Sequence, residues 1–300
     1  MKTFMGRRRF FITFCFTIFI TITLPVLGSE NPEESPLMLW SIEDEDTTLY
    51  LMGTIHILPS SFTHAFPYYR VATMADYLAL EVDISTKDSA DRMVTLLQTK
   101  GMYPQGKSVE DDLPPQLLHD VKDFFGASSW NQFKQLRPWA LNFALIEAGQ
   151  FANTGLGDGH EQWLFQQASQ AQVLEVEGVD AQVRALASLS LKDQIGLIRA
   201  SLNEGQNFQE ELERMVEVWQ EGDLEQLTLE MEELKSPTMA QILLFQRNHV
   251  MADKAVEYLN TLAGTVLMAV GCGHFLGEQG IPALLEEQGL TVKRLYSSDF

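Results

Sequence analysis

Two stretches of the chain decide the fold: LYLMGTIHIL at residues 49–58 and LMAVGCGHFL at residues 267–276. Each begins with an apolar run typical of a buried strand and continues into Gly-x-x-His followed by two apolar residues. Each is also followed by a helical pattern and then by another strand-like segment. This internal similarity predicts two related halves, each consisting of a strand, a Gly-x-x-His motif, a helix and a second strand. Such halves would bring His56 and His274 to one edge of one sheet.

The Gly-x-x-His pattern itself suits the end of a strand. Glycine permits a tight turn or a positive φ there, and the histidine then projects from that turn. One such motif occurs by chance in many proteins, whereas two copies in matched contexts are far more specific. We therefore interpret His56 and His274 as a functional pair rather than as two separate structural residues.

The remaining pattern predicts an α/β (α+β) fold with a mixed central sheet. Residues 36–52 read as a hairpin with an acidic turn, and Tyr77–Ile84 reads as a buried strand with Glu81 near its end. Residues from about 89 to 262 are mostly helical in pattern, with a short strand at 172–177 and a glycine-rich loop at 155–159. We predict a single domain over residues 29–300 that carries this large helical insertion.

The N-terminus has the pattern of a targeting segment. Lys2 and the arginines at 7–9 precede 18 residues without a charge, and Val26-Leu27-Gly28 then provides a cleavage site. This predicts a signal peptide over residues 1–28, cleaved near Gly28, and an exported protein that is periplasmic or secreted. The alternative is an uncleaved anchor at the short limit for crossing a bilayer, and only then would the membrane be a partner.

Composition excludes several classes of function. Asp and Glu number 41 against 21 Lys and Arg, and a net charge of -20 opposes binding to nucleic acid. Cys15 lies in the predicted signal, so the mature chain keeps only Cys272 and forms no internal disulfide. The motifs of nucleotide enzymes, serine hydrolases and zincins are absent from the sequence. The partner we expect is a peptide or small-molecule substrate, and the oligomeric state stays open.

Further short motifs accompany the two Gly-x-x-His stretches in a fixed order. They are Leu39-Trp40, Leu80-Glu81-Val82-Asp83, Arg137-Pro138-Trp139, Gly157-Asp158, Val176-Glu177 with Gln182, Arg247-Asn248 and Phe275-Leu276-Gly277. Together they resemble the TraB/PrgY/GumN family, which includes the Tiki membrane-anchored proteases, over nearly the whole mature chain. The chain departs from the family at residues 176–178, where Val-Glu-Gly replaces the more usual Leu-Glu-Thr, and this leaves open whether Glu175 or Glu177 faces the site.

The resemblance implies an α/β core with inserted helices and one shared polar site. The Tiki branch is described as metal-dependent peptidases supported by manganese or cobalt, so the resemblance implies an exported hydrolase of a peptide or amide bond. Related erythromycin-esterase-like and haem-binding ChaN-like proteins imply two alternatives. One is a metal-free hydrolase in which a histidine is the base, and the other is a non-catalytic protein that captures a peptide signal or haem.

The residue types suit a metal-assisted reaction. Imidazole and carboxylate groups are the usual ligands for manganese, cobalt or zinc, so His56, His274 and Glu81 form a three-ligand set with positions left for water. Such a cation would lower the pKa of its bound water and polarise a carbonyl group. In the metal-free alternative, Glu81 would instead orient a histidine that acts as general base.

The remaining polar candidates have supporting roles. Glu177 or Asp83 is the predicted general base, and Glu81 is counted with the catalytic residues as well as with the ligands. Arg247 either stabilises developing negative charge or forms a buried ion pair with one of these carboxylates, and both interpretations are open. The stretch Asp158-Gly159-His160-Glu161 has the composition of a ligand cluster, but its glycine-rich context favours a loop and helix start, with Asp158 as the N-cap.

Overall fold

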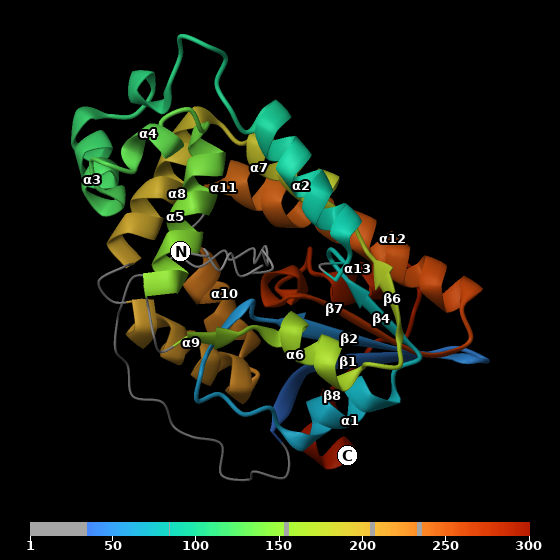
Figure 1. The fold of residues 1–300 in the computed structure, drawn as a ribbon. Helices are drawn as coiled ribbons and strands as arrows, with labels where there is room; N and C mark the ends of the chain where they lie inside the picture. Colours follow the sequence, from blue (N-terminus) through green and yellow to red (C-terminus); the bar gives the residue numbers. More distant parts are fainter. Residues whose placement is uncertain (1–34, 84, 153–155, 205–207, 233–235) are drawn as a thin grey trace, which may run out of the picture.

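A mixed six-stranded sheet forms the centre of the molecule, in the order β6-β4-β7-β2-β1-β8 (Figure 1). The computed structural model describes residues 35–300 apart from 84, 153–155, 205–207 and 233–235, so the predicted signal peptide lies outside the described residues. The expected mixed α/β fold is confirmed. The strands are β1 (Pro36–Glu43), β2 (Thr47–Thr54), β3 (Ile57–Pro59), β4 (Tyr77–Leu80), β5 (Leu156–Asp158), β6 (Gln172–Glu175), β7 (Gly264–Gly271) and β8 (Lys293–Tyr296).

Strands β2 and β7 lie side by side, parallel, and in register over their full length. Thr54 pairs with Gly271 at the last position, so both Gly-x-x-His motifs leave the sheet at the same edge. Strand β4 pairs with the other side of β7, and β1 pairs with β2 antiparallel. The two predicted halves, β2–α1–β4 and β7–α13–β8, are therefore interleaved in one sheet rather than placed end to end.

Helices cover the sheet and build the inserted region. They are α1 (Phe66–Met74), α2 (Lys87–Lys100), α3 (Pro115–Phe125), α4 (Trp130–Phe133), α5 (Pro138–Ala152), α6 (His160–Gln167), α7 (Val179–Ser188), α8 (Leu191–Glu204), α9 (Phe208–Glu221), α10 (Leu224–Glu232), α11 (Pro237–Ala240), α12 (Gln246–Thr261) and α13 (Ile281–Glu287). Shorter segments are the 3₁₀ turns η2 (Val109–Asp111), η4 (Cys272–Phe275) and η5 (Ser297–Asp299) and the π-helical turn η3 (Gln241–Phe245). None of the helices described is long and apolar enough to cross a membrane.

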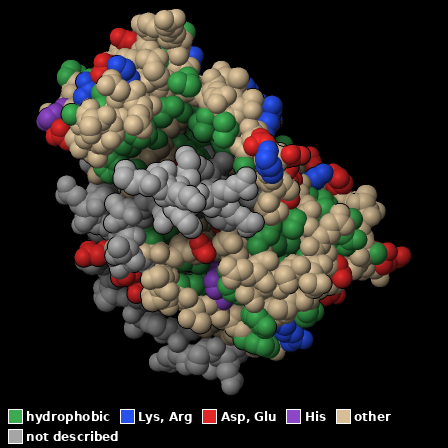
Figure 2. Space-filling view, viewed as in Figure 1, with side chains coloured by type: hydrophobic (Ala, Val, Ile, Leu, Met, Phe, Trp, Pro, Cys, Tyr) green, Lys and Arg blue, Asp and Glu red, His purple; other side chains and the backbone are tan. Residues whose placement is uncertain are grey.

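Only part of the predicted insertion forms a separate layer, because α6, α9, α10 and α12 pack in the same apolar cluster as the sheet. Figure 1 shows α2, α3, α4, α5, α7 and α8 together, away from β1, β2 and β8. Two apolar clusters hold this layer, distinct from the larger cluster that packs both faces of the sheet. Acidic side chains are spread over both parts on the face seen in Figure 2, so the negative charge is not gathered on one element there.

Two local predictions differ from the structure. Residues 156–158 of the predicted glycine-rich loop form β5. They do so because β3, which follows the first Gly-x-x-His motif, pairs with them antiparallel. The predicted strand Tyr77–Ile84 ends at Leu80, since the backbone turns there and the Glu81 carboxylate accepts a hydrogen bond from the Gly271 N–H at 2.8 Å.

The β3–β5 pair presses the start of α6 against the first histidine motif. Gly159 is the N-cap of α6, and the N–H of His160 donates to the Ile55 carbonyl at 3.0 Å. A Cβ on Gly159 would lie 2.8 Å from the Cα of His56 and closer still to its carbonyl group. The φ of -76° is ordinary, so the close approach of the two backbones is what requires glycine here.

We predict that Gly159→Ala lowers the free energy of unfolding by at least about 2 kcal/mol, because backbone rather than a flexible side chain must move. The control is Gly196→Ala in α8, where a Cβ would meet nothing within 4 Å. Urea denaturation of both variants tests this prediction. Equal unfolding midpoints would show that the backbone of His56 can accommodate a Cβ at position 159.

Candidate active site

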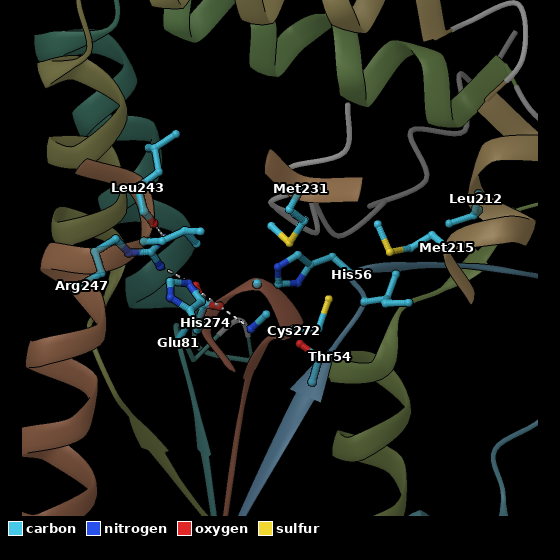
Figure 3. A pocket seen from close by; sticks show the side chains of 14 residues that line it. Thr54, His56, Glu81, Leu212, Met215, Met231, Leu243, Arg247, Cys272 and His274 are labelled. Carbon is cyan, nitrogen blue, oxygen red and sulfur yellow. Dashed lines mark hydrogen bonds and ion pairs between the residues drawn. The ribbon is translucent and has the colours of Figure 1, made fainter. Parts of the chain in front are cut away.

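A cavity of about 70 Å³ lies where β2 and β7 end, lined by residues of both Gly-x-x-His motifs (Figure 3). Its polar wall consists of Thr54, His56, Glu81, Arg247 and His274. Its apolar wall consists of Leu212, Met215, Met231, Leu243 and Leu244, contributed by α9, α10 and η3. A volume of this size holds a few water molecules or a small chemical group.

Gly271 lies at the centre of the polar wall. A Cβ built on Gly271 would lie 3.4 Å from Glu81 Oε1, 3.5 Å from His56 Nε2 and 3.7 Å from His274 Cδ2. The structure thus brings the three predicted ligands around one point. Glycine leaves that point open, and its φ of -50° and ψ of 136° are available to any residue.

His56 is held by a carboxylate that the sequence analysis did not assign to it. Its Nδ1 lies 2.8 Å from Glu161 Oε1, which also accepts a hydrogen bond from the Thr54 hydroxyl at 2.6 Å. Burial alone would lower the pKa of His56, but the charge and hydrogen bond of Glu161 raise it to about 9. In return, His56 and Thr54 outweigh burial and lower the pKa of Glu161 to about 2. With Nδ1 engaged, Nε2 is the nitrogen of His56 that faces the cavity.

His274 is oriented in the same manner by an amide. Its Nδ1 lies 2.5 Å from Asn248 Oδ1, and the Asn248 amide nitrogen donates to the Gln279 carbonyl at 2.6 Å. Because that amide nitrogen is already a donor, Oδ1 must accept, and the proton resides on His274 Nδ1. The other ring nitrogen, Nε2, lies 3.9 Å from Glu81 Oε1.

Arg247 bridges two buried carboxylates. Its Nη2 lies 2.6 Å from Glu81 Oε2 and 2.5 Å from Glu177 Oε2, and both carboxylates are less than a tenth exposed. Gln182 and the Gly271 N–H donate to the other lone pairs of Glu81, at 2.9 Å and 2.8 Å. Burial alone would raise the pKa of Glu81, but Arg247, followed by the two histidines, holds it well below its usual range. Arg247 therefore forms the buried ion pair that one of the two sequence interpretations expected. It also lines the cavity.

The three predicted ligands do not fit a divalent cation as they stand. Among the described residues, no group of three or more His, Cys, Asp or Glu side chains is arranged to hold a metal ion. Glu81, the third predicted ligand, already pairs with Arg247 and accepts two further hydrogen bonds. Only the two imidazole Nε2 atoms keep the chemistry of a metal ligand, so metal binding stays a prediction.

Of the other residues considered in the sequence, Glu177 faces the site, whereas Glu175, Asp83 and Asp158 do not. Glu177 points inward to Arg247, whereas Glu175 is exposed and accepts from the Asp83 N–H at 2.8 Å. Asp83 is not one of the described residues that line the cavity, and its carboxylate accepts from the Ser85 N–H. Asp158 is exposed in β5, so the prediction of Asp158 as the α6 N-cap is wrong: Gly159 takes that position because β5 continues up to it.

Sequence reasoning considered His160 and Glu161 as part of a ligand cluster but favoured a loop there and did not assign either residue to the site. His160 is fully buried, and its Nδ1 lies 2.9 Å from the Ile55 nitrogen, which fixes the backbone next to His56. The signal was present as Gly-His-Glu at a helix start, but nothing local connects it to a histidine 105 residues earlier. Asn248 belonged to a motif already noted beside Arg247, and its role as the partner of His274 needed the structure.

Comparison with known proteins gives one match. The family model described as TraB/PrgY/gumN covers residues 38–294, which include both Gly-x-x-His motifs and every polar residue of the cavity. No curated protein and no solved structure matches the chain.

We predict that Arg247→Ala lowers the free energy of unfolding by about 3–5 kcal/mol, because it leaves Glu81 and Glu177 as buried carboxylates without their cation. Adding Glu81→Gln to this variant should recover part of the loss. The control is Arg92→Ala, which breaks an exposed ion pair with Asp180 and should change stability very little. Guanidinium denaturation gives all three values, and equal effects of Arg92→Ala and Arg247→Ala would contradict the buried bridge.

The His56–Glu161 pair predicts a pH dependence of stability. Since the pKa of His56 rises from 6.5 to about 9 on folding, the pair stabilises the protein fully below pH 6.5 and loses this effect as the pH rises through 9. The free energy of unfolding should fall by on the order of 3 kcal/mol across that window. Glu161→Gln should remove most of the fall in denaturation curves at pH 6.5 and 9, whereas an unchanged slope would argue against the pair.

Proposed function

The chain belongs to the TraB/PrgY/gumN family, and from this membership and its paired imidazoles we propose that it is an exported hydrolase that cleaves a peptide or amide bond. One observation carries the proposal. Two histidines from neighbouring strand ends face one cavity, and each is fixed through Nδ1 by an oxygen acceptor, Glu161 for His56 and Asn248 for His274.

The two imidazoles are suited to opposite roles. Glu161 keeps His56 protonated at neutral pH, so its Nε2–H can donate a proton to the leaving amine. His274, whose Nδ1 is bound to the Asn248 amide oxygen, would in its neutral form use Nε2 to accept a proton from an attacking water molecule. The two imidazoles thus have different partners, a carboxylate for His56 and an amide for His274, and a pair of unlike titratable groups suits acid–base catalysis.

Side chains of the cavity can supply every proton transfer that cleavage of an amide bond requires. Water adds its oxygen to the carbonyl carbon while His274 Nε2 takes one of its protons. The carbonyl oxygen gains negative charge, which the guanidinium of Arg247 is placed to stabilise from the same wall. The bond from carbon to nitrogen breaks as His56 Nε2 gives its proton to the amine, and exchange with solvent restores both histidines.

The family resemblance also implies manganese or cobalt, and the ligand chemistry of imidazole and carboxylate allows zinc as well. Imidazoles whose Nδ1–H is bound to an oxygen acceptor are typical metal ligands, so His56 and His274 are the residues that would hold such a cation. Glu81 does not fit as the third ligand, because Arg247 neutralises it. The steps above therefore use only side chains of the chain.

The size of the cavity favours catalysis over capture of a whole ligand. Pockets that bury a drug-sized molecule occupy about 300–1,000 Å³, whereas this cavity has about 70 Å³. A volume of that size admits a scissile amide and its water.

We predict that Gly271→Ala abolishes turnover with little change in thermal stability. The added methyl group lies in ordinary contact with Glu81, His56 and His274 and takes the space where the reacting group would lie. Turnover of a synthetic peptide library, read by mass spectrometry, should fall at least about 100-fold, a barrier increase of about 2.7 kcal/mol. The control is Gly149→Ala in α5, where a Cβ would meet nothing within 4 Å.

The same preparations decide between the two forms of hydrolysis. Wild-type protein without a histidine tag, His56→Ala and His274→Ala are assayed for metal content and peptide turnover. Turnover without bound metal, lost in both variants, supports the acid–base pair. One equivalent of metal, lost in both variants together with turnover, supports the metal-dependent form. No turnover with or without added manganese, cobalt or zinc would overturn the proposal.

A further inference from the structure

The two sides of the cavity differ in chemistry, and His56 lies between them. Figure 3 shows Arg247 and His274 to one side of the His56 imidazole, and Met215 and Leu212 to the other side. Helix α9 carries these two apolar residues and packs against β3, the strand that directly follows His56. The apolar side of the cavity therefore adjoins the histidine to which the hydrolase proposal assigns the proton for the leaving amine.

Met231 reaches across this apolar side from α10. A Cβ built on Gly273 would lie 3.0 Å from Met231 Sδ and 3.6 Å from Leu244 Cδ2, so both side chains end over the turn that carries His274. Figure 3 also shows the Met231 side chain beside the His56 imidazole. Met231 and Leu244 are partly exposed, whereas the other apolar side chains of this wall are buried. These two side chains thus form the mouth of the cavity, and Met231 sets how much space remains beside His56.

Building on the proposed hydrolysis, we propose that the substrate is a peptide with a small apolar side chain on the amine side of the scissile bond, and that Met231 limits the size of this side chain. The nitrogen of that substrate residue must reach His56 Nε2 to receive its proton. The side chain of the same residue then extends over the surface next to His56, which is apolar. The carbonyl side of the bond is turned toward His274 and Arg247.

The volume of the cavity sets the upper limit for this side chain. An apolar protein cavity of about 150 Å³ accommodates a benzene ring, whereas this cavity has about 70 Å³ for the whole reacting group. With an amide in place, the remaining space suits a methyl or isopropyl group, as in alanine or valine, and excludes an aromatic ring. Shortening Met231 would enlarge that space without removing a polar side chain of the site.

The apolar side also discriminates against charged substrates. The charged side chains among the described lining residues, His56, Glu81 and Arg247, belong to the polar wall, and each already has a partner of opposite charge. A lysine or aspartate side chain of the substrate would lose its hydration against Met215 and Leu212 and would gain no new partner.

Packing of the helices alone is the competing explanation of the apolar wall. Methionine often fills irregular gaps between elements, and in that case Met231 would contribute only to stability. Packing alone predicts that a change of Met231 alters the stability and leaves the cleaved sequences as they were. A limit on substrate size predicts that the same change alters which peptides are cleaved.

The test uses the full untagged chain and a library of short peptides randomised at every position. Mass spectrometry of the products identifies the new amino termini, each of which is the residue from the amine side of a cleaved bond. In the wild type we expect alanine and valine at these termini at least about 10-fold more often than phenylalanine, lysine or aspartate. Even one methylene in an apolar pocket changes discrimination about 10- to 200-fold.

Two substitutions at the mouth provide the comparison. Met231→Ala should raise the frequency of leucine and phenylalanine at the new termini at least about 10-fold relative to alanine, and Leu244→Ala should change it in the same direction. The control is Leu229→Ala on the exposed side of the same helix, α10, which should keep the wild-type distribution. If Met231→Ala does not fold, Leu244→Ala and the wild-type distribution still decide the result.

The outcomes separate this preference from the hydrolase proposal. Cleavage with phenylalanine, lysine or aspartate as frequent as alanine at the new termini would overturn the preference and leave the hydrolase proposal standing. A folded Met231→Ala variant with the wild-type distribution would do the same for the role of Met231. An absence of cleavage of every peptide, with and without added manganese, cobalt or zinc, would overturn the hydrolase proposal and the preference that rests on it.

Discussion

The parallel pairing of β2 with β7 is the interaction on which the rest of the site depends. Eight consecutive residues pair in register, from Thr47 with Gly264 to Thr54 with Gly271. A slip of one residue would exchange the faces to which the side chains of one strand point and displace one histidine from the other. The sheet therefore sets the spacing of the two motifs, and the helices only complete the cavity around them.

Charged side chains inside the protein lie in small groups of opposite charge. Glu161 is matched by His56, and Arg247 is shared between Glu81 and Glu177. Removing an isolated charge from water costs several kcal/mol, so each buried ion needs its partner within hydrogen-bond distance. The same partners orient the side chains, which means that stability and the geometry of the site rest on shared contacts. The π-helical turn η3 immediately precedes α12 and Arg247, a placement often found near functional sites.

The parts of the fold that the sequence predicted correctly are those with a local pattern along the chain. The apolar runs before Gly53 and Gly271 marked two strands, and their likeness indicated adjacent ends, as the structure has them. Family resemblance placed Arg247 and Gln182 in the right neighbourhood. Local pattern carried no information on β5, whose three residues form a strand only because β3 offers an edge. The choice of Glu161 rather than Glu81 as the partner of His56 likewise depends on how α6 packs, and spacing along the chain does not report that.

The interleaved sheet also sets the order in which the molecule can assemble. The hairpin β1–β2 is synthesised early, yet the neighbour that β2 requires begins at Gly264, more than 200 residues later. Until then one side of β2 is an unpaired edge, the kind of surface through which chains aggregate. Closure of such a long loop slows folding, so the cavity at the ends of β2 and β7 is completed only when nearly the entire polypeptide has emerged. A chain in transit across a membrane would meet this constraint as a need to remain unfolded until its last strands arrive.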